Sequence, residues 1–291
     1  MSWELPDRIS VREVGPRDGL QNEDPVPTDA KVALLDALSA TGVQRIEAVS
    51  FVRPSAIPQM ADADEVWKRA ARAPSVRYSA LVPNLRGALR ALDAGFTELE
   101  AVVSASETHN RKNVNRSTGE SLDEIAGIIA VAHDRGATVQ VIVSTAWGCP
   151  YEGDVPVPRV VSVAGRAIAD GADSASFGDT TGMATPTRVR ALVGAFRSAH
   201  PGTGLNLHFH NTRGTGLANV LAALDLARQI AANSPVAVRA AKRAIRHGWG
   251  VSLEAGLDIE DAAWRTAALS ADRREGIAAF VEKRKPAWPG Q

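Results

Sequence analysis

The chain has 291 residues, of which 45% are hydrophobic and 23% charged, and its formal net charge at pH 7 is zero. These values are ordinary for a soluble globular protein and argue against nucleic-acid binding as its main function. No uncharged apolar run approaches the roughly 18 residues that span a bilayer, and residues 1–10 lack the basic region and apolar stretch of a signal peptide. Since Cys149 is the single cysteine, we expect a cytoplasmic protein without intramolecular disulfides. The lack of a long apolar run predicts that it has no membrane partner.

Seven short apolar or β-branched runs along the chain predict β-strands. The segments between them have apolar residues at helical spacing, and several of these segments end at a glycine. Strands that alternate with helices indicate parallel βα units. The predicted strands are Ile9–Val14, Arg45–Phe51, Val76–Val82, Glu98–Ser104, Thr138–Ser144, Asp173–Phe177 and Leu205–His210.

The chain after His210 contains no further apolar run that predicts a strand. From about Asp225 the sequence predicts only helices, which start at Ser234, Ser252 and Ala271. We therefore predict an α/β fold: a (β/α)8 TIM-type barrel that is incomplete, with seven strands, and is followed by an all-helical C-terminal segment. The predicted division is a barrel over residues 1–224 and a helical segment over 225–291. A tail helix or a partner subunit is expected to cover the strand edge that the missing eighth strand leaves open.

Polar side chains end the first and the last of these strands. Arg17 and Asp18 follow the first strand, while His208 and His210 are two apart in the last one, so that both imidazoles face the same side. The carboxyl ends of barrel strands meet at one face. One carboxylate and two imidazoles there suit Mg²⁺, Mn²⁺ or Zn²⁺. The alternative is a pair of hydrogen-bonded pocket histidines without a metal.

Seven motifs in family order make the first 224 or so residues similar to bacterial hydroxymethylglutaryl-CoA lyases, which belong to a metal-dependent lyase barrel superfamily. Together they span about three quarters of the chain. The motifs are VREVGPRDGLQNE from Val11, IEAVSFVRPSAIPQMADADEV from Ile46, VPNLRGALRALDAG from Val82, SASETHNRKNVNRS from Ser104, GCPYEG from Gly148, FGDTTGMATP from Phe177 and HFHNTRGTGLANVLAAL from His208.

This resemblance implies cleavage of 3-hydroxy-3-methylglutaryl-CoA, or of a similar 3-hydroxyacyl-CoA, to acetoacetate and acetyl-CoA with Mg²⁺ or Mn²⁺. Asp18, His208 and His210 would bind the metal. Arg17 would contact the thioester carbonyl and stabilise the enolate that forms as the carbon–carbon bond breaks.

The resemblance also assigns three further residues. Gln21 would bind the substrate together with Arg17, and Glu47 and Asp179 match acidic pocket residues that we predict to be catalytic. A purely structural alternative for Arg17 is an ion pair inside the barrel. Its partner would then be Glu13, Glu47 or Asp179.

The chain departs from the family after the His-x-His strand. In the family an eighth strand follows, then a Gly-rich loop with the cysteine that reprotonates the enolate, and then an asparagine that is the fourth protein ligand of the metal. None of these occurs here, and Cys149 matches a different family cysteine, so impaired activity is expected. His109, Asn113 and Asn115 are predicted on a polar loop that either contacts substrate or is simply solvated.

Residues from about 226 to 291 resemble the C-terminal helices of an enoyl-CoA hydratase of the crotonase family. In that family this part covers the active site and helps to assemble trimers, but the catalytic core that precedes it is absent here. Two alternatives to the lyase therefore remain: a catalytically weak fusion product whose tail binds CoA thioesters or partner subunits, and an enoyl-CoA hydratase. In each case the expected partners are an acyl-CoA and further copies of the chain in a homo-oligomer.

Overall fold

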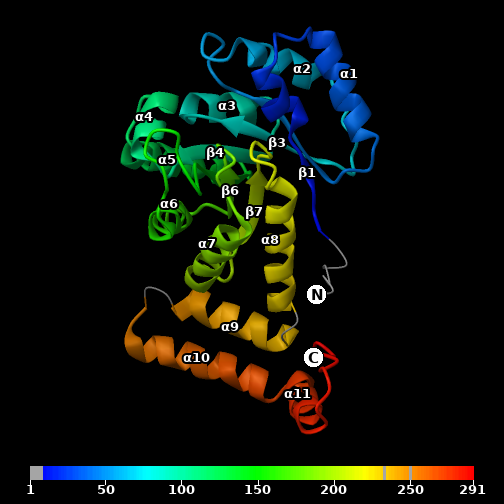
Figure 1. Ribbon diagram of the computed structural model, residues 1–291, viewed down its shortest axis with the longest axis vertical. Helices are drawn as coiled ribbons and strands as arrows, with labels where there is room; N and C mark the ends of the chain where they lie inside the picture. Colours follow the sequence, from blue (N-terminus) through cyan, green and yellow to red (C-terminus); the bar gives the residue numbers. More distant parts are fainter. Residues whose placement is uncertain (1–8, 232–233, 249–250) are drawn as a thin grey trace.

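Seven strands form one parallel sheet in the computed structural model, which describes residues 9–231, 234–248 and 251–291 (Figure 1). Their order in the sheet is their order in the sequence, as the predicted barrel fold requires. Only the first strand is clearly shorter than predicted. The strands are β1 (Arg12–Glu13), β2 (Arg45–Ser50), β3 (Arg77–Val82), β4 (Glu98–Ser104), β5 (Thr138–Ser144), β6 (Ser174–Asp179) and β7 (Gly204–Phe209).

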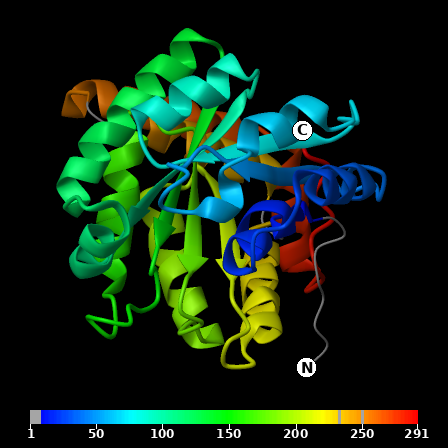
Figure 2. The same cartoon turned by 90° about the horizontal axis from the view of Figure 1, so that it is seen from above.

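Helices lie on the outer side of the curled sheet (Figure 2). The predicted helix ends are confirmed at Gly95, Gly136 and Gly171, whose φ angles of 89°, 70° and 108° favour glycine. The outer helices are α1 (Thr28–Ser39), α2 (Ala63–Arg69), α3 (Leu85–Asp93), α5 (Thr118–Asp134), α6 (Val157–Ala169), α7 (Pro186–Ala199) and α8 (Gly216–Ala231). The helix α4 (Glu107–Val114) follows the carboxyl end of β4, and the short turns are η1 (Gly15–Gly19), η2 (Leu20–Asn22) and η3 (Pro58–Met60). His109 and Asn113, which we predicted on a loop, lie in α4.

The two faces of the sheet differ in polarity. Strand side chains that face the helices are apolar and buried, as Leu99, Val141 and Phe177 illustrate. Side chains that face the barrel interior are largely polar, among them Glu47 and Glu100. The hydrophobic core therefore lies between sheet and helices, and the interior is left for charged groups.

An irregularity in β2 brings two polar residues to the same face. The pairing of β2 with β3 shifts register between Glu47 and Val49, so that Ala48 is an extra residue. Successive side chains in a regular strand alternate between faces, and residues three apart would point in opposite directions. Because of the shift, Glu47 and Ser50 both face the interior.

The sheet does not close. β1 and β7 are its two end strands, and among the described residues no eighth strand follows β7, as the sequence predicted. The side chains of β7 are only partly buried, whereas nearly all those of β2 are buried. Backbone groups at both ends are thus left without a neighbouring strand.

The tail helices α9 (Pro235–Gly248), α10 (Leu253–Ala268) and α11 (Ala271–Val281) confirm the three predicted helix starts. They lie beyond the amino-terminal ends of the strands, opposite the end at which α8 begins (Figure 1). Of the two covers expected for the open strand edge, a tail helix or a partner subunit, the described residues therefore do not supply the tail helix. The predicted division between residues 224 and 225 falls inside α8.

Asp272 joins the parts of this tail. Its carboxylate accepts hydrogen bonds from Ser234 Oγ at 2.6 Å and Val236 N at 3.2 Å, and from Gly290 N at 2.6 Å. Ser252 caps α10 by accepting from Ala255 N. Among the described residues, no helix has the length and apolar character needed to cross a membrane.

Candidate functional site

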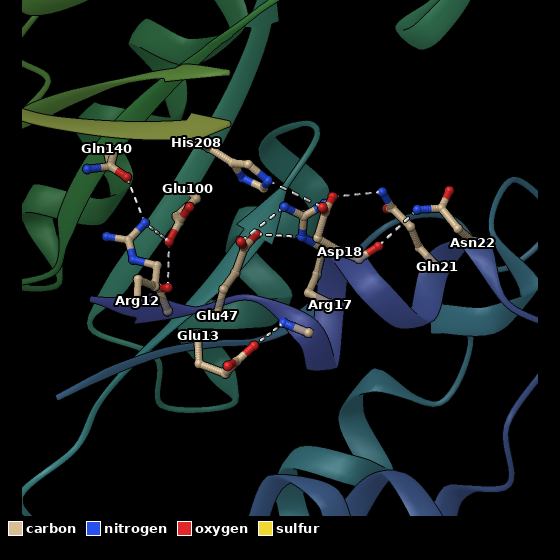
Figure 3. Close-up of polar contacts among 12 residues, drawn as sticks. Arg12, Glu13, Arg17, Asp18, Gln21, Asn22, Glu47, Glu100, Gln140 and His208 are labelled. Carbon is tan, nitrogen blue, oxygen red and sulfur yellow. Dashed lines mark hydrogen bonds and ion pairs between the residues drawn. The ribbon is translucent and has the colours of Figure 1, made fainter. Parts of the chain in front are cut away.

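Arg17 is held between two carboxylates. Its Nε and Nη2 donate to the two oxygens of Glu47 at 2.6 and 3.0 Å, and its Nη1 donates to Asp18 Oδ1 at 2.7 Å (Figure 3). Arg17 is only 7% exposed and Glu47 only 1%. A bidentate pair of this kind fixes the plane of the guanidinium. Of the three structural partners considered for Arg17, the structure selects Glu47 and adds Asp18.

A single π-helical turn, η1, positions Arg17 and Asp18 after the short strand β1. Arg17 N and Asp18 N both donate to Val14 O, at 3.1 and 2.6 Å. The Glu13 carboxylate accepts from Gly15 N at 2.7 Å and so holds the start of the turn. Turns of this type occur often at functional sites.

Asp18 also meets the two histidines. Its Oδ2 lies 3.5 Å from His208 Nε2 and 3.4 Å from His210 Nε2, and the three candidate ligand atoms lie within 4.8 Å of one another. His210 Nδ1 is 3.1 Å from Thr180 O, which leaves Nε2 for a ligand role. Gln21 Nε2 donates to Asp18 Oδ1 at 3.1 Å. One carboxylate and two imidazoles are a donor set that fits a divalent metal ion.

Burial and contacts within this cluster shift the pKa values of its members. Burial alone would raise the pKa of Asp18, but the hydrogen bond from His210 and the charge of Arg17 outweigh it and lower that pKa to about 2. The hydrogen bond to Asp18 raises the pKa of His210, and burial lowers the pKa of His208. Asp18 is therefore ionised and His208 neutral at pH 7, the forms in which both bind metals.

A cavity of about 440 Å³ opens above these residues at the carboxyl ends of the strands. Asp179 lines it and is 1% exposed; its Oδ1 accepts from Ala184 N at 2.9 Å, while Oδ2 has no partner among the described residues. Burial raises the pKa of Asp179. Every predicted site residue except Glu47, which lies beneath Arg17, lines this cavity: Arg17, Asp18, Gln21, Asp179, His208 and His210.

A second buried ion pair lies next to Glu47 and was not predicted from the sequence. Arg12 of β1 pairs with Glu100 of β4, and its Nη1 donates to Gln140 Oε1 of β5 at 2.7 Å (Figure 3). Burial and the nearby Glu47 raise the pKa of Glu100 to about 7. The sequence signal for this pair is the polar residues at alternate positions of several predicted strands, since such residues share one face of the sheet.

Cys149 lies outside the cavity wall. It is 1% exposed, and its Sγ accepts hydrogen bonds from Ser106 Oγ at 2.9 Å and Tyr151 N at 3.3 Å. This placement agrees with the expectation that Cys149 does not replace the family's catalytic thiol.

A protein-family model described as HMGL-like matches residues 8–232. The chain belongs to the HMGL-like family. Hydroxymethylglutaryl-CoA lyase of Bacillus subtilis (strain 168) is 44% identical over 222 residues, which are 76% of this chain and 74% of that protein. These matches support an enzyme of the lyase class in a divalent-metal-dependent family.

Solved structures of HMGL-like relatives show the same fold. Hydroxymethylglutaryl-CoA lyase from Pseudomonas aeruginosa has a TM-score of 0.74 and 40% identity, covering 76% of this chain and 74% of that one. An HMG-CoA lyase from Acinetobacter baumannii, solved with coenzyme A and 3-methylmalate, has a TM-score of 0.71 and 43% identity, covering 74% of this chain and 70% of that one.

The tail has a separate and shorter match. A model described as enoyl-CoA hydratase/isomerase matches residues 217–291, so the two family matches overlap over residues 217–232. That overlap lies almost entirely in α8. The second match covers about a quarter of the chain and gives the crotonase resemblance only weak support.

Proposed function

We propose that the protein cleaves 3-hydroxy-3-methylglutaryl-CoA, or a similar 3-hydroxyacyl-CoA, to acetoacetate and acetyl-CoA. The observation that carries the proposal is the convergence of Asp18, His208 and His210 beside the guanidinium of Arg17 in one cavity. The relative from Acinetobacter baumannii, solved with coenzyme A, supports a CoA thioester as substrate.

In this proposal Asp18, His208 and His210 hold Mg²⁺ or Mn²⁺. A bound divalent ion lowers the pKa of a coordinated hydroxyl and thereby favours its deprotonation. The three side chains fit this role, since His210 is oriented by Thr180 O and the Asp18 carboxylate stays ionised at neutral pH.

Arg17 is proposed to stabilise the enolate of the leaving acetyl-CoA. Its guanidinium is fixed by Glu47 before substrate arrives, so little reorganisation is needed as negative charge develops on the thioester oxygen. Glu47 acts in this scheme by holding Arg17, and Gln21, which contacts Asp18, helps to bind substrate. Asp179 has a buried carboxylate oxygen that no other described residue contacts by a hydrogen bond, and it is proposed to take part in proton transfer in the cavity.

The test is acetoacetate release from 3-hydroxy-3-methylglutaryl-CoA by the purified protein, with Mn²⁺ or Mg²⁺ and with EDTA. We expect metal-dependent release at a rate below that of a complete family member, because the chain lacks the family's thiol acid. Release that persists in EDTA would contradict the metal-dependent mechanism.

The protein is further proposed to be cytoplasmic.

A second proposed function is association through the tail. Large apolar side chains are exposed on α10 and α11, among them Trp264 at 64% and Phe280 at 85%. Together with neighbouring residues of α9 and α10, Trp264 lines a surface hollow of about 880 Å³. Exposed apolar patches of this kind mark interaction sites, so homo-oligomers or partner subunits are proposed to bind here. The third possibility, enoyl-CoA hydratase activity, is tested by hydration of crotonyl-CoA.

A further inference from the structure

The proposed reaction requires a proton carrier. When the carbon–carbon bond of the substrate breaks, its electron pair becomes that of the enolate, and the tertiary hydroxyl gives up its proton as the ketone forms. The enolate carbon must then gain a proton to become the methyl group of acetyl-CoA. The single cysteine of the chain is buried outside the cavity, so another group has to carry this proton.

His109 lines the cavity from the side of β4 and α4, together with Arg17 and Asp179. A hydrogen bond of 2.6 Å joins its Nδ1 to Ser104 Oγ at the end of β4. Its Nε2 has no hydrogen-bond partner within the described part of the chain. One ring nitrogen is therefore held by the protein, and the other is available to a ligand.

The backbone around His109 is firmly held. Ser106 caps α4, its Oγ accepting from His109 N at 3.1 Å. The next residue, Asn110, is buried, accepts from Ser104 N at 2.9 Å and donates to Ser121 Oγ at 2.7 Å. The imidazole is thus positioned before substrate binds, as a proton-transfer group should be.

His109 also has a suitable charge state. Burial lowers its pKa, and nearby Glu152 opposes this only in part, so the imidazole is neutral at pH 7 and can accept a proton. Other cavity groups have other contacts: Arg17 is held by two carboxylates, and Asp18 meets two histidines. His109 and Asp179 are left as the cavity groups best placed to exchange protons with a ligand.

We propose that His109 is the proton carrier of the lyase reaction, an inference that rests on the proposed function. Its neutral imidazole accepts the proton released from the substrate hydroxyl, and the resulting imidazolium donates that proton from Nε2 to the enolate carbon. The electron pair of the broken carbon–carbon bond ends in the new carbon–hydrogen bond. The imidazole returns to its neutral form, so that no other reactant is consumed.

The test follows proton transfer without carbon–carbon cleavage. Acetyl-CoA is incubated in D₂O with the Mn²⁺-loaded protein, and deuterium in its methyl group is measured. His109→Ala should lower this exchange and acetoacetate release by about 10²-fold or more, with a Kd for Mn²⁺ within about two-fold of wild type. Added imidazole should restore part of the exchange, which a purely structural role would not produce.

His247→Ala, at an exposed position of α9, is the matched control and should behave as wild type. If His109→Ala does not fold, His109→Gln provides the same measurement. Exchange that stays at the wild-type rate in a folded His109 variant, or a loss that imidazole does not restore, would overturn the role of His109. If the wild-type protein shows neither exchange nor release, the proposed function itself fails.

Discussion

Oδ2 of Asp18 lies 3.4 Å from Nε2 of His210, although these residues come from the two ends of an open sheet. Asp18 follows β1 and His210 follows β7, and no strand pairing joins β1 to β7 in the described structure. The candidate metal site therefore bridges the opening that the eighth strand of a closed barrel would fill. A bound cation would hold the two ends together.

A cation at this site should stabilise the fold. At 100 times its Kd, Mn²⁺ is expected to add about 2.7 kcal/mol to the free energy of unfolding, which is a rise of several degrees in Tm. Asp18→Asn and His210→Ala should weaken Mn²⁺ binding by at least about 100-fold and remove this rise. Calorimetric titration and thermal melts with Mn²⁺ check both. His133→Ala, on the outer surface, should keep the shift.

Mn²⁺ binding should weaken as the pH falls. The hydrogen bond to Asp18 raises the pKa of His210 above its usual value of 6.5, and a protonated imidazole cannot bind a metal. Asp18 stays ionised down to about pH 2 and does not contribute to this change. The Kd for Mn²⁺ in calorimetric titrations should therefore be larger at pH 6 than at pH 8. A Kd that is constant over this range would argue against His210 as a ligand.

Arg17→Lys should impair catalysis more than metal binding. Lysine cannot reproduce the bidentate contact with Glu47 and the simultaneous contact with Asp18. We expect kcat for acetoacetate release to fall by about 10²- to 10³-fold, with a Kd for Mn²⁺ within a few-fold of wild type. Arg69→Lys, which changes an exposed ion pair, is the control. Equal activity of Arg17→Lys and wild type would rule out the enolate-stabilising role.

Glu100→Gln should change how stability depends on pH. Burial and Glu47 raise the pKa of folded Glu100 from 4.5 to about 7. The contribution of protonated Glu100 to the free energy of unfolding is therefore fully present below pH 4.5 and is lost as the pH rises through 7. Relative to wild type, the free energy of unfolding of the variant should rise by roughly 3 kcal/mol between pH 4.5 and pH 8. Urea unfolding at several pH values measures this gain. Glu254→Gln, on α10, should show no such trend.

Phe280→Glu should reduce self-association without changing the metal site. Phe280 is largely exposed on α11, beyond the amino-terminal ends of the strands, and the candidate site lies at their carboxyl ends. Sedimentation velocity should show smaller species for the variant, with an unchanged Kd for Mn²⁺. If the wild-type protein is monomeric at micromolar concentrations, the proposed association through the tail is wrong.

The sequence by itself determined the elements and the residues that end them. Apolar runs, helical spacing and terminal glycines predicted seven strands and the three tail helices, because these signals depend on neighbouring residues. The spacing of His208 and His210 also fixed their common face. The motifs around Asp18 then predicted which distant residues would meet these histidines.

Only the tertiary structure decided how distant segments combine. The register shift in β2 brings Ser50 to the same face as Glu47, and the pairing of Arg12 with Glu100 joins residues 88 positions apart. The placement of His109 in the cavity wall depends on Ser104 and Asn110. The tail helices lie away from the open sheet edge. Each of these outcomes depends on packing and burial between segments far apart in the chain, which local sequence patterns do not encode.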